Sequence, residues 1–146
     1  TGYFAVRLAE QLKNGQVICF EQAPKMAEYL ENRLRESGFS NTKVRTDGSD
    51  GNLALEKQAD LIFSVDVYHH IQDRGRFFAQ LAQSLSAEGR IVIIDRTEEK
   101  VENQPAGHRV STEMVKEEMK AAGLVFVEEL NFLLPIQYYL SFKRAE

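Results

Sequence analysis

Short apolar runs alternate with segments whose apolar residues recur at helical spacing, and this alternation constrains the fold more than any other feature. The runs are 17–20, 61–65 and 91–94, and the last of them is four consecutive apolar residues, Ile-Val-Ile-Ile. An uninterrupted apolar run of this kind suits a strand that is covered on both faces. Strands that alternate with helices at short spacing predict a mostly parallel α/β sheet.

Helices are predicted between these strands from apolar residues about four positions apart, with glycine or proline at the ends. The first predicted helix carries Phe4, Leu8 and Leu12 and ends near 14–15, and the second runs from Pro24 to Gly38 with Ala27, Leu30 and Leu34 as its apolar residues. The third carries Phe77, Leu81 and Leu85 and is closed by Gly89. The fourth spans 112–122 and is ended by Gly123. A short strand near 43–46 and a polar loop over 96–109 complete the central part of the chain.

The last two predicted strands, near 125–131 and 136–142, are separated by only a few residues around Leu134-Pro135. A parallel crossover needs a dozen or more residues, so these two strands must be antiparallel. The sheet is therefore expected to be doubly wound and mostly parallel, with a C-terminal antiparallel strand pair.

An acidic residue follows the first apolar run at a spacing that suggests nucleoside binding. Doubly wound sheets bind ligands at the carboxyl ends of their strands, next to a glycine-rich turn. Glu21 lies about 20 residues beyond Gly2, the distance at which a ribose-binding carboxylate is expected. Thr1-Gly2 looks like the tail of such a turn, so we expect that the first strand is missing and that the chain is an N-terminally incomplete single domain.

Several motifs in order resemble the class I methyltransferases, especially the ubiquinone/menaquinone-biosynthesis type group. Thr1-Gly2 matches the end of the family's glycine turn, 17–21 its acid-ended strand, and Pro24-Lys25-Met26 the start of its next helix. The stretch 59–70 resembles the family's fourth-strand motif and 85–95 its fifth. The resemblance implies a Rossmann-like fold, S-adenosylmethionine as cofactor, and direct in-line methyl transfer to a small molecule.

The resemblance also implies roles for individual residues. Glu21, with Gln22 beside it, would hold the ribose hydroxyls, and Met26 would pack near the adenine. Asp47 would accept a hydrogen bond from the adenine amine, next to Gly48, with Asp50 as an alternative. The full set of implied cofactor residues is Thr1, Gly2, Glu21, Gln22, Met26, Asp47, Gly48, Val65 and Asp66.

The candidate catalytic residues are His69 and His70, which follow the 61–65 run at the expected ligand edge. Histidine titrates near neutral pH, so either one is a candidate base or substrate-orienting group. A structural role, with one histidine packed and the other solvated, is the alternative. Asp95 ends the 91–94 strand and is a candidate substrate contact, whereas 116–118 is predicted to be a solvated charged face.

The composition of the chain indicates which classes of binding partner are expected. A net charge of -4, from 18 basic and 22 acidic side chains without a basic block, argues against nucleic acid. The single cysteine, Cys19, excludes a disulfide framework and a cysteine-based zinc site, and the adjacent histidines do not make a metal site, so no metal is expected. No apolar run reaches the ~18 residues of a membrane span, and a cytoplasmic location is expected.

Two other classes of function stay open. A nicotinamide-dependent (NAD(P)) oxidoreductase shares the glycine turn and the ribose acid, although the chain lacks a Tyr-x-x-x-Lys pair. A non-catalytic methyltransferase-like module that binds a partner protein is the second. The sequence identifies neither the methyl acceptor nor the oligomeric state, because a fold does not fix its substrate.

Overall fold

The computed structural model describes residues 2–98 and 109–145, and the chain divides into two compact units, Thr1–Ser49 and Asp50–Glu146. Each unit has its own sheet, with two strands in the first and four in the second. That the whole chain forms one methyltransferase-like domain stays a prediction.

The first unit contains two helices and two parallel strands. Its elements are α1 (Tyr3–Gln11), β1 (Val17–Phe20), α2 (Pro24–Glu36) and β2 (Thr42–Arg45). Its core forms where Ala5 of α1 meets Leu30 and Leu34 of α2, with partly buried apolar residues of both strands packed against them. Pro24 occupies the first turn of α2, as predicted, because proline lacks the N–H that this position would leave unpaired.

The predicted first helix is present, but it ends before residues 14–15 and buries residues other than Phe4 and Leu12. Helix α1 ends at Gln11, and Phe4 and Leu12 are each 41% exposed, whereas Ala5 and Ala9 are buried. The small alanine side chains allow the helix to pack closely on its neighbours. The side-chain amide of Asn41 donates to the carbonyl of Ala9 at 3.0 Å, which satisfies a backbone acceptor near the end of α1.

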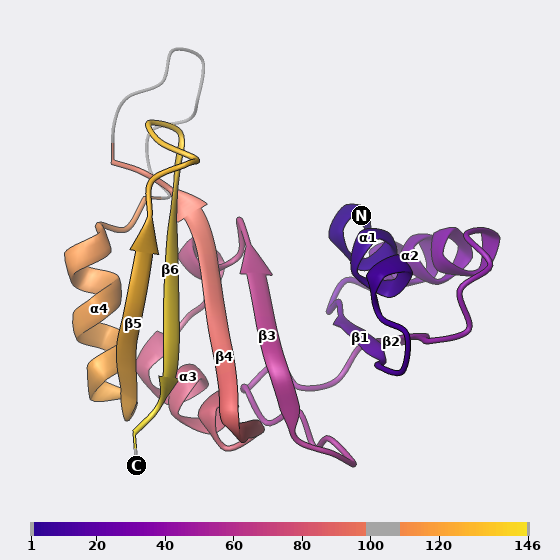
Figure 1. Ribbon diagram of the computed structural model, residues 1–146, viewed down its shortest axis with the longest axis horizontal. Helices are drawn as coiled ribbons and strands as arrows, with labels where there is room; N and C mark the ends of the chain where they lie inside the picture. The colour runs from indigo at the N-terminus through magenta and orange to yellow at the C-terminus, as the bar shows by residue number, and fades with distance from the viewer. Residues whose placement is uncertain (1, 99–108, 146) are drawn as a thin grey trace. The chain divides into compact units, whose positions relative to one another are not determined.

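The second unit is a four-stranded mixed sheet in the order β3-β4-β6-β5. Its elements are β3 (Ala59–Val65), the short helix η1 (Tyr68–His70), α3 (Arg74–Ala82), β4 (Leu85–Arg96), α4 (Thr112–Ala121), β5 (Leu124–Leu130) and β6 (Gln137–Arg144). Strands β3 and β4 are parallel, and β6 is antiparallel to both β4 and β5. The predicted mixed α/β sheet with a C-terminal antiparallel pair is confirmed. Helices α3 and α4 lie together beside the sheet (Figure 1).

Strand β4 begins earlier than the sequence pattern predicted. Leu85 and Gly89, expected to lie in and close the preceding helix, both belong to β4, and α3 ends at Ala82. Leu85 pairs with Ala59 of β3, and the register shifts before Leu61. A Cβ at position 89 would lie 2.8 Å from the carbonyl oxygen of Ala59, so glycine is needed here for strand approach rather than for helix termination.

The core of the second unit lies between β4, β6 and the two helices. Ile91 and Ile93 are fully buried, and they pair across the sheet with the buried Phe142 and Leu140. Met119 of α4 is also fully buried. Burying side chains of this size stabilises a fold by about 1.5–3 kcal/mol each, which explains why this run was the clearest strand signal in the sequence.

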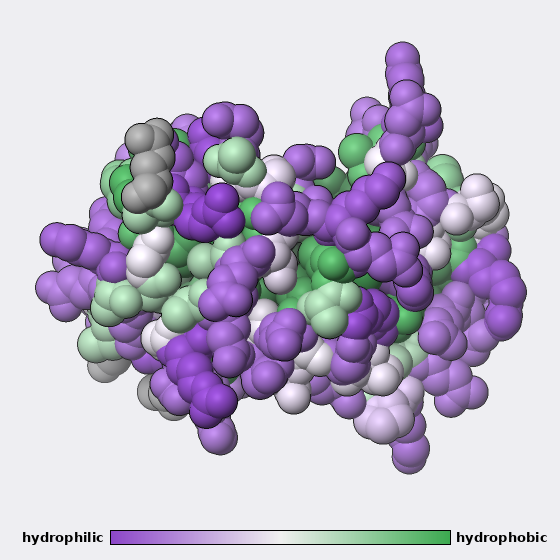
Figure 2. All heavy atoms as spheres, turned by 90° about the horizontal axis from the view of Figure 1, so that it is seen from below, coloured by the Kyte–Doolittle hydropathy of each residue, from purple (hydrophilic) through white to green (hydrophobic). Residues whose placement is uncertain are grey.

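Exposed apolar residues gather near the turn between β5 and β6. Phe132 is 67% exposed, Ile136 50% and Leu134 48%. On the face shown in Figure 2, hydrophilic residues predominate and hydrophobic ones form smaller areas between them. Within residues 2–98 and 109–145, every helix is too short or too polar to cross a membrane.

Candidate functional site

The carboxyl ends of β1 and β2 bring Glu21 and Asp47 to the same edge of the first unit's sheet. Glu21 directly follows β1, and its backbone N–H donates to the carbonyl of Arg45, the last residue of β2, at 3.0 Å. Asp47 lies two residues beyond that point. The predicted neighbourhood of these two acids therefore exists, because parallel strands end at one edge of a sheet.

Local hydrogen bonds hold the Glu21 carboxylate at the start of α2. Its Oε1 accepts the backbone N–H of Ala23 at 3.0 Å, the residue that caps the helix. Gln22 is exposed, and Met26, in the first turn of α2, is 38% exposed. The carboxylate and the thioether are thus presented from one strand–helix junction.

Asp47 is oriented by an arginine from the same segment. Arg45 forms two hydrogen bonds to its carboxylate, one from Nε to Oδ1 at 2.8 Å and one from Nη2 to Oδ2. The Arg45 hydrogen bond lowers the pKa of Asp47, so the group is ionised at neutral pH. Gly48 follows with φ 85°, a left-handed conformation that turns the chain away from β2.

Gly2 adopts the conformation that a glycine turn at a helix start requires. It caps α1 with φ 77°, and a Cβ added there would lie 2.7 Å from Cδ1 of Leu30 in α2. Thr1, the other residue assigned to this turn, lies outside the described residues. Asp50, the alternative adenine acceptor, belongs to the second unit, where its Oδ1 accepts the backbone N–H of Asn52 at 3.0 Å.

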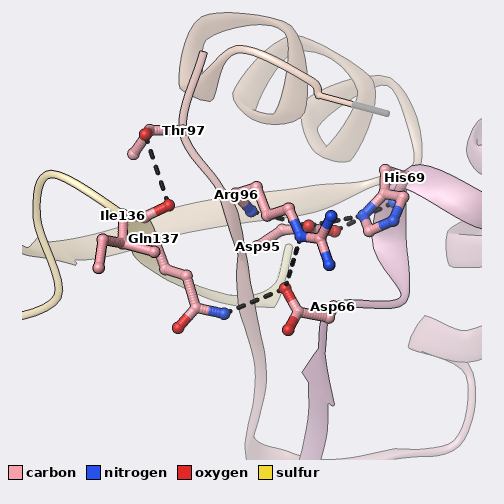
Figure 3. Close-up of polar contacts among 7 residues, drawn as sticks. All are labelled: Asp66, His69, Asp95, Arg96, Thr97, Ile136 and Gln137. Atoms are coloured by element: carbon pink, nitrogen blue, oxygen red, sulfur yellow. Dashed lines mark hydrogen bonds and ion pairs between the residues drawn. The ribbon is translucent and has the colours of Figure 1, made fainter. Parts of the chain in front are cut away.

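In the second unit, Val65 ends β3 and Asp66 follows it in a left-handed conformation with φ 53°. The Asp66 carboxylate accepts a hydrogen bond from Nε2 of Gln137 at 3.0 Å, and Nε of Arg96 lies 3.7 Å away (Figure 3). Positive φ at a non-glycine residue is strained and is often found at functional sites. Gln137 and Arg96, neither of them predicted, fix this carboxylate from β6 and β4.

His69 and Asp95 form a buried pair at the ends of β3 and β4 (Figure 3). Nδ1 of His69 lies 2.6 Å from Oδ1 of Asp95, and the His69 backbone N–H donates to Oδ2 at 3.1 Å. The side chains are only 3% and 2% exposed. In the tautomer that carries its proton on Nδ1, the His69 ring donates to this carboxylate.

The structure distinguishes the two candidate histidines. His70 is exposed, and its ring centroid lies 4.0 Å from that of His69. Asp95, expected as a substrate contact, is 1% exposed and bonds His69 and the backbone N–H of Arg96 instead. The alternation along β4 places Asp95 in line with the buried Ile91 and Ile93, where it contacts His69, and a direct contact of Asp95 with substrate stays a prediction.

A polar cluster that the sequence analysis missed lies between η1, α3 and α4. Glu118, predicted to be solvated, receives hydrogen bonds from Arg74 at 2.6 and 2.8 Å and from the hydroxyl of Tyr68, which is fully buried. The Arg74 hydrogen bonds lower the pKa of Glu118, and burial raises the pKa of Tyr68. The sequence did contain a sign that Glu118 is partly buried. It lies three residues after Val115, so both residues are on the same face of α4, and Val115 is buried.

Replacing Glu118 with glutamine is expected to lower the unfolding free energy by about 1–3 kcal/mol at pH 7, because a charge-assisted pair is lost. The pKa of Glu118 is lower in the folded state than in the unfolded state. The stability that Glu118 contributes is therefore fully present at pH values above its unfolded-state pKa, and it is lost as the pH falls through its folded-state pKa. Urea unfolding should therefore show a smaller difference from wild type near pH 3. The exposed neighbour Glu117→Gln is the control, and an equal loss there would contradict the assignment.

A small pocket of about 180 Å³ adjoins the end of β4 and the start of α4. Thr97, Val110, Leu134 and Tyr138 line it, together with Ser111, whose hydroxyl caps α4 by accepting the N–H of Met114. Tyr138 is 1% exposed, and its hydroxyl finds no hydrogen-bond partner in the described part of the chain. Tyr138 thus belongs to the core and Tyr139 is half-buried.

Comparison with known proteins gives one family match and one curated relative. A family model described as a methyltransferase domain matches residues 1–91. A protein-L-isoaspartate O-methyltransferase of Methanococcus aeolicus is 47% identical over 45 residues, which cover 30% of this chain and 21% of that protein. The chain therefore spans about a fifth of the length of this relative.

Solved structures show the same fold at low sequence identity. A SAM-dependent methyltransferase from Aquifex aeolicus has a TM-score of 0.85 at 16% identity, over 97% of this chain and 76% of that one. An S-adenosylmethionine-dependent methyltransferase from Clostridium acetobutylicum has a TM-score of 0.79 at 11% identity, over 99% and 80%. The resemblance to class I methyltransferases is confirmed, whereas the ubiquinone/menaquinone-type grouping stays a prediction. By its family match and its fold, the chain belongs to the class I, Rossmann-like methyltransferase domain family.

Proposed function

We propose that this protein is an S-adenosylmethionine-dependent methyltransferase that acts on a small molecule. Family membership supports methyl transfer, although a fold by itself does not fix a reaction. The observation that carries the proposal is the placement of Glu21 and Asp47 at one sheet edge, beside the exposed Met26. This is the edge at which doubly wound sheets bind nucleotides.

The residues of the first unit fit this cofactor chemically. A carboxylate accepts hydrogen bonds from both hydroxyls of a ribose, which is the proposed role of Glu21. The Asp47 carboxylate suits an adenine amine, and Met26 offers a polarizable surface to the ring. Gly2 starts α1 with φ 77°, and the place that a Cβ would take is filled by Leu30, so this helix start requires glycine.

Two residues of the second unit are also proposed to bind the cofactor. Val65 and Asp66 end β3, and the strained backbone of Asp66 is held by Gln137 and Arg96. We assign Val65 and Asp66 to the cofactor and keep Gln22 and Gly48 as flanking positions in the first unit. Variants in either unit that weaken binding of the same cofactor would support a single domain.

His69 is the proposed base in this reaction. When bound, S-adenosylmethionine supplies an electrophilic methyl carbon, so the protein mainly has to orient the acceptor in line with it. His69 takes the acceptor proton at Nε2, and Asp95 stabilises the resulting imidazolium through Nδ1.

A small acceptor is favoured by the size of the pocket near the carboxyl end of β4, about 180 Å³. The local match to a protein-L-isoaspartate O-methyltransferase favours a second candidate, methylation of a peptide carboxylate. Transfer of labelled methyl groups to a panel of small phenols, amines and carboxylates, compared with isoaspartyl peptides, distinguishes the two. A cytoplasmic location stays a prediction from the single cysteine, Cys19.

Replacing Glu21 with alanine should weaken S-adenosylmethionine binding by about 1–3 kcal/mol, since a charge-assisted hydrogen bond to the ribose is lost. Calorimetric titration of the full-length protein measures this directly. Glu31→Ala, an exposed acid in the middle of α2, is the matched control. Unchanged affinity in the Glu21 variant would remove that residue from the site.

The alternative functions predict different binding and turnover. Titration with NAD should give no heat, whereas preference for NAD over S-adenosylmethionine would overturn the proposal in favour of an oxidoreductase. Cofactor binding without turnover on any acceptor of the panel would favour the non-catalytic module. Family membership disfavours the first alternative.

A further inference from the structure

Arg45 contacts both acids at the carboxyl edge of the first unit's sheet. Its carbonyl accepts the backbone N–H of Glu21 at 3.0 Å, and its guanidinium binds the carboxylate of Asp47. Both acids are therefore positioned relative to one residue, the last residue of β2. The proposed roles of Glu21 and Asp47 require a fixed spacing between them, and Arg45 is the residue that links the two.

The side chain of Arg45 fixes the direction of the Asp47 carboxylate as well as its position. Nε of Arg45 donates to Oδ1 at 2.8 Å, and Nη2 donates to Oδ2. Two parallel hydrogen bonds from a planar guanidinium hold both oxygens in one orientation, which a single ammonium group does not. The carboxylate cannot turn without breaking at least one of these bonds.

Arg45 is itself supported by the neighbouring strand. Its Cζ lies 5.2 Å from the ring centroid of Phe20, which is also its partner in the register of β1 with β2. A guanidinium is attracted to the face of an aromatic ring. The Arg45 side chain is 19% exposed, so it is packed against the sheet before any ligand binds.

The Asp47 carboxylate is accessible although Arg45 holds it. Its side chain is 57% exposed. An ionised carboxylate has about four acceptor positions, and the two hydrogen bonds from Arg45 use one on each oxygen. A ligand N–H can therefore still donate to Asp47, and the orientation of the carboxylate sets the direction from which it must come.

A fixed acceptor of this kind distinguishes purines by the group at C6. The amine of adenine donates, whereas a 6-oxo purine has an acceptor at C6 and its nearest donor is the adjacent N1–H. A carboxylate that is free to turn can follow that N1–H, but a carboxylate held by a guanidinium cannot. It would face the 6-oxo oxygen, and two acceptors without a donor between them are unfavourable.

We infer that Arg45 is a positioning residue that makes the cofactor site selective for 6-amino over 6-oxo purine nucleosides. Its side chain acts on the base through Asp47, and its backbone sets the position of Glu21 relative to that acid. This inference rests on the proposed binding of S-adenosylmethionine and assigns the selectivity for its base to a residue outside the proposed cofactor contacts.

S-adenosylhomocysteine and S-inosylhomocysteine form a matched pair of probes, since only the second has a 6-oxo purine. In calorimetric titrations of the full-length protein, the adenosyl compound should bind more tightly. In Arg45→Met the ratio of the two affinities should fall about tenfold, as expected when one oriented hydrogen bond is lost. Methionine still packs against Phe20, and a fold that is merely weakened would lower both affinities together without changing their ratio.

Lys43→Met is the matched control for charge. Lys43 is an exposed residue of the same strand, and its charge also lowers the pKa of Asp47. This variant should keep the wild-type ratio, because Lys43 acts on Asp47 through charge alone. An unchanged ratio in Arg45→Met, or an equal fall in both variants, would overturn the inference and leave the cofactor proposal standing. Failure of the wild-type protein to bind either compound would overturn both.

Discussion

Replacing His69 with alanine is expected to lower kcat for methyl transfer by about 10²–10⁴-fold, the usual contribution of a positioned general base. The reason is the buried contact between Nδ1 of His69 and Oδ1 of Asp95, 2.6 Å long, which fixes the ring and its tautomer. Single-turnover kinetics with saturating S-adenosylmethionine measure the chemical step. Cofactor affinity should change little, because the proposed cofactor residues do not include His69.

Asp95→Asn separates positioning from simple structural support. Asparagine has nearly the same shape but can present its amide nitrogen to the ring, so the tautomer is no longer fixed. A drop in kcat with little change in KM would identify Asp95 as a positioning residue. His70→Ala, at an exposed position, should keep nearly full activity. A His69→Ala variant with wild-type kcat would exclude His69 as the base.

The apolar strands were predictable because burial on both faces leaves a continuous apolar run. The run 91–94 lies in β4, and the short link near Pro135 required the antiparallel pairing of β5 with β6 that is observed. The end of α3 was not predictable in this way. Leu85 continues the helical spacing of Phe77 and Leu81, yet it pairs with Ala59 in the sheet, so tertiary pairing outweighed local periodicity.

The candidate site was predictable where a residue directly follows a strand. Glu21 follows β1 and Asp66 follows β3, as the sequence indicates for each unit, and their roles stay predictions. Hydrogen-bond partners from distant elements could not be predicted. Gln137 of β6 contacts Asp66, and Glu118 of α4 contacts Tyr68. Such contacts depend on register and helix rotation, which a single sequence does not specify.

The second large effect is expected from Gly51→Ala, which should lower the unfolding free energy by about 2–5 kcal/mol. Position 51 has φ 88°, which costs an L-residue about 1–2 kcal/mol. An added Cβ would also lie 2.2 Å from the carbonyl oxygen of Phe77, an atom of the α3 backbone. Relieving that overlap requires the loop or the helix to move, which costs about 1–3 kcal/mol more. Urea unfolding of the full-length protein measures the total.

Gly123→Ala isolates the backbone contribution within the same unit. Gly123 has φ 80°, and a Cβ there would meet nothing within 4 Å, so alanine should cost only about 1–2 kcal/mol. The difference between the two variants then reports the contact between Gly51 and Phe77 alone. Equal losses would mean that the loop does not pack against α3.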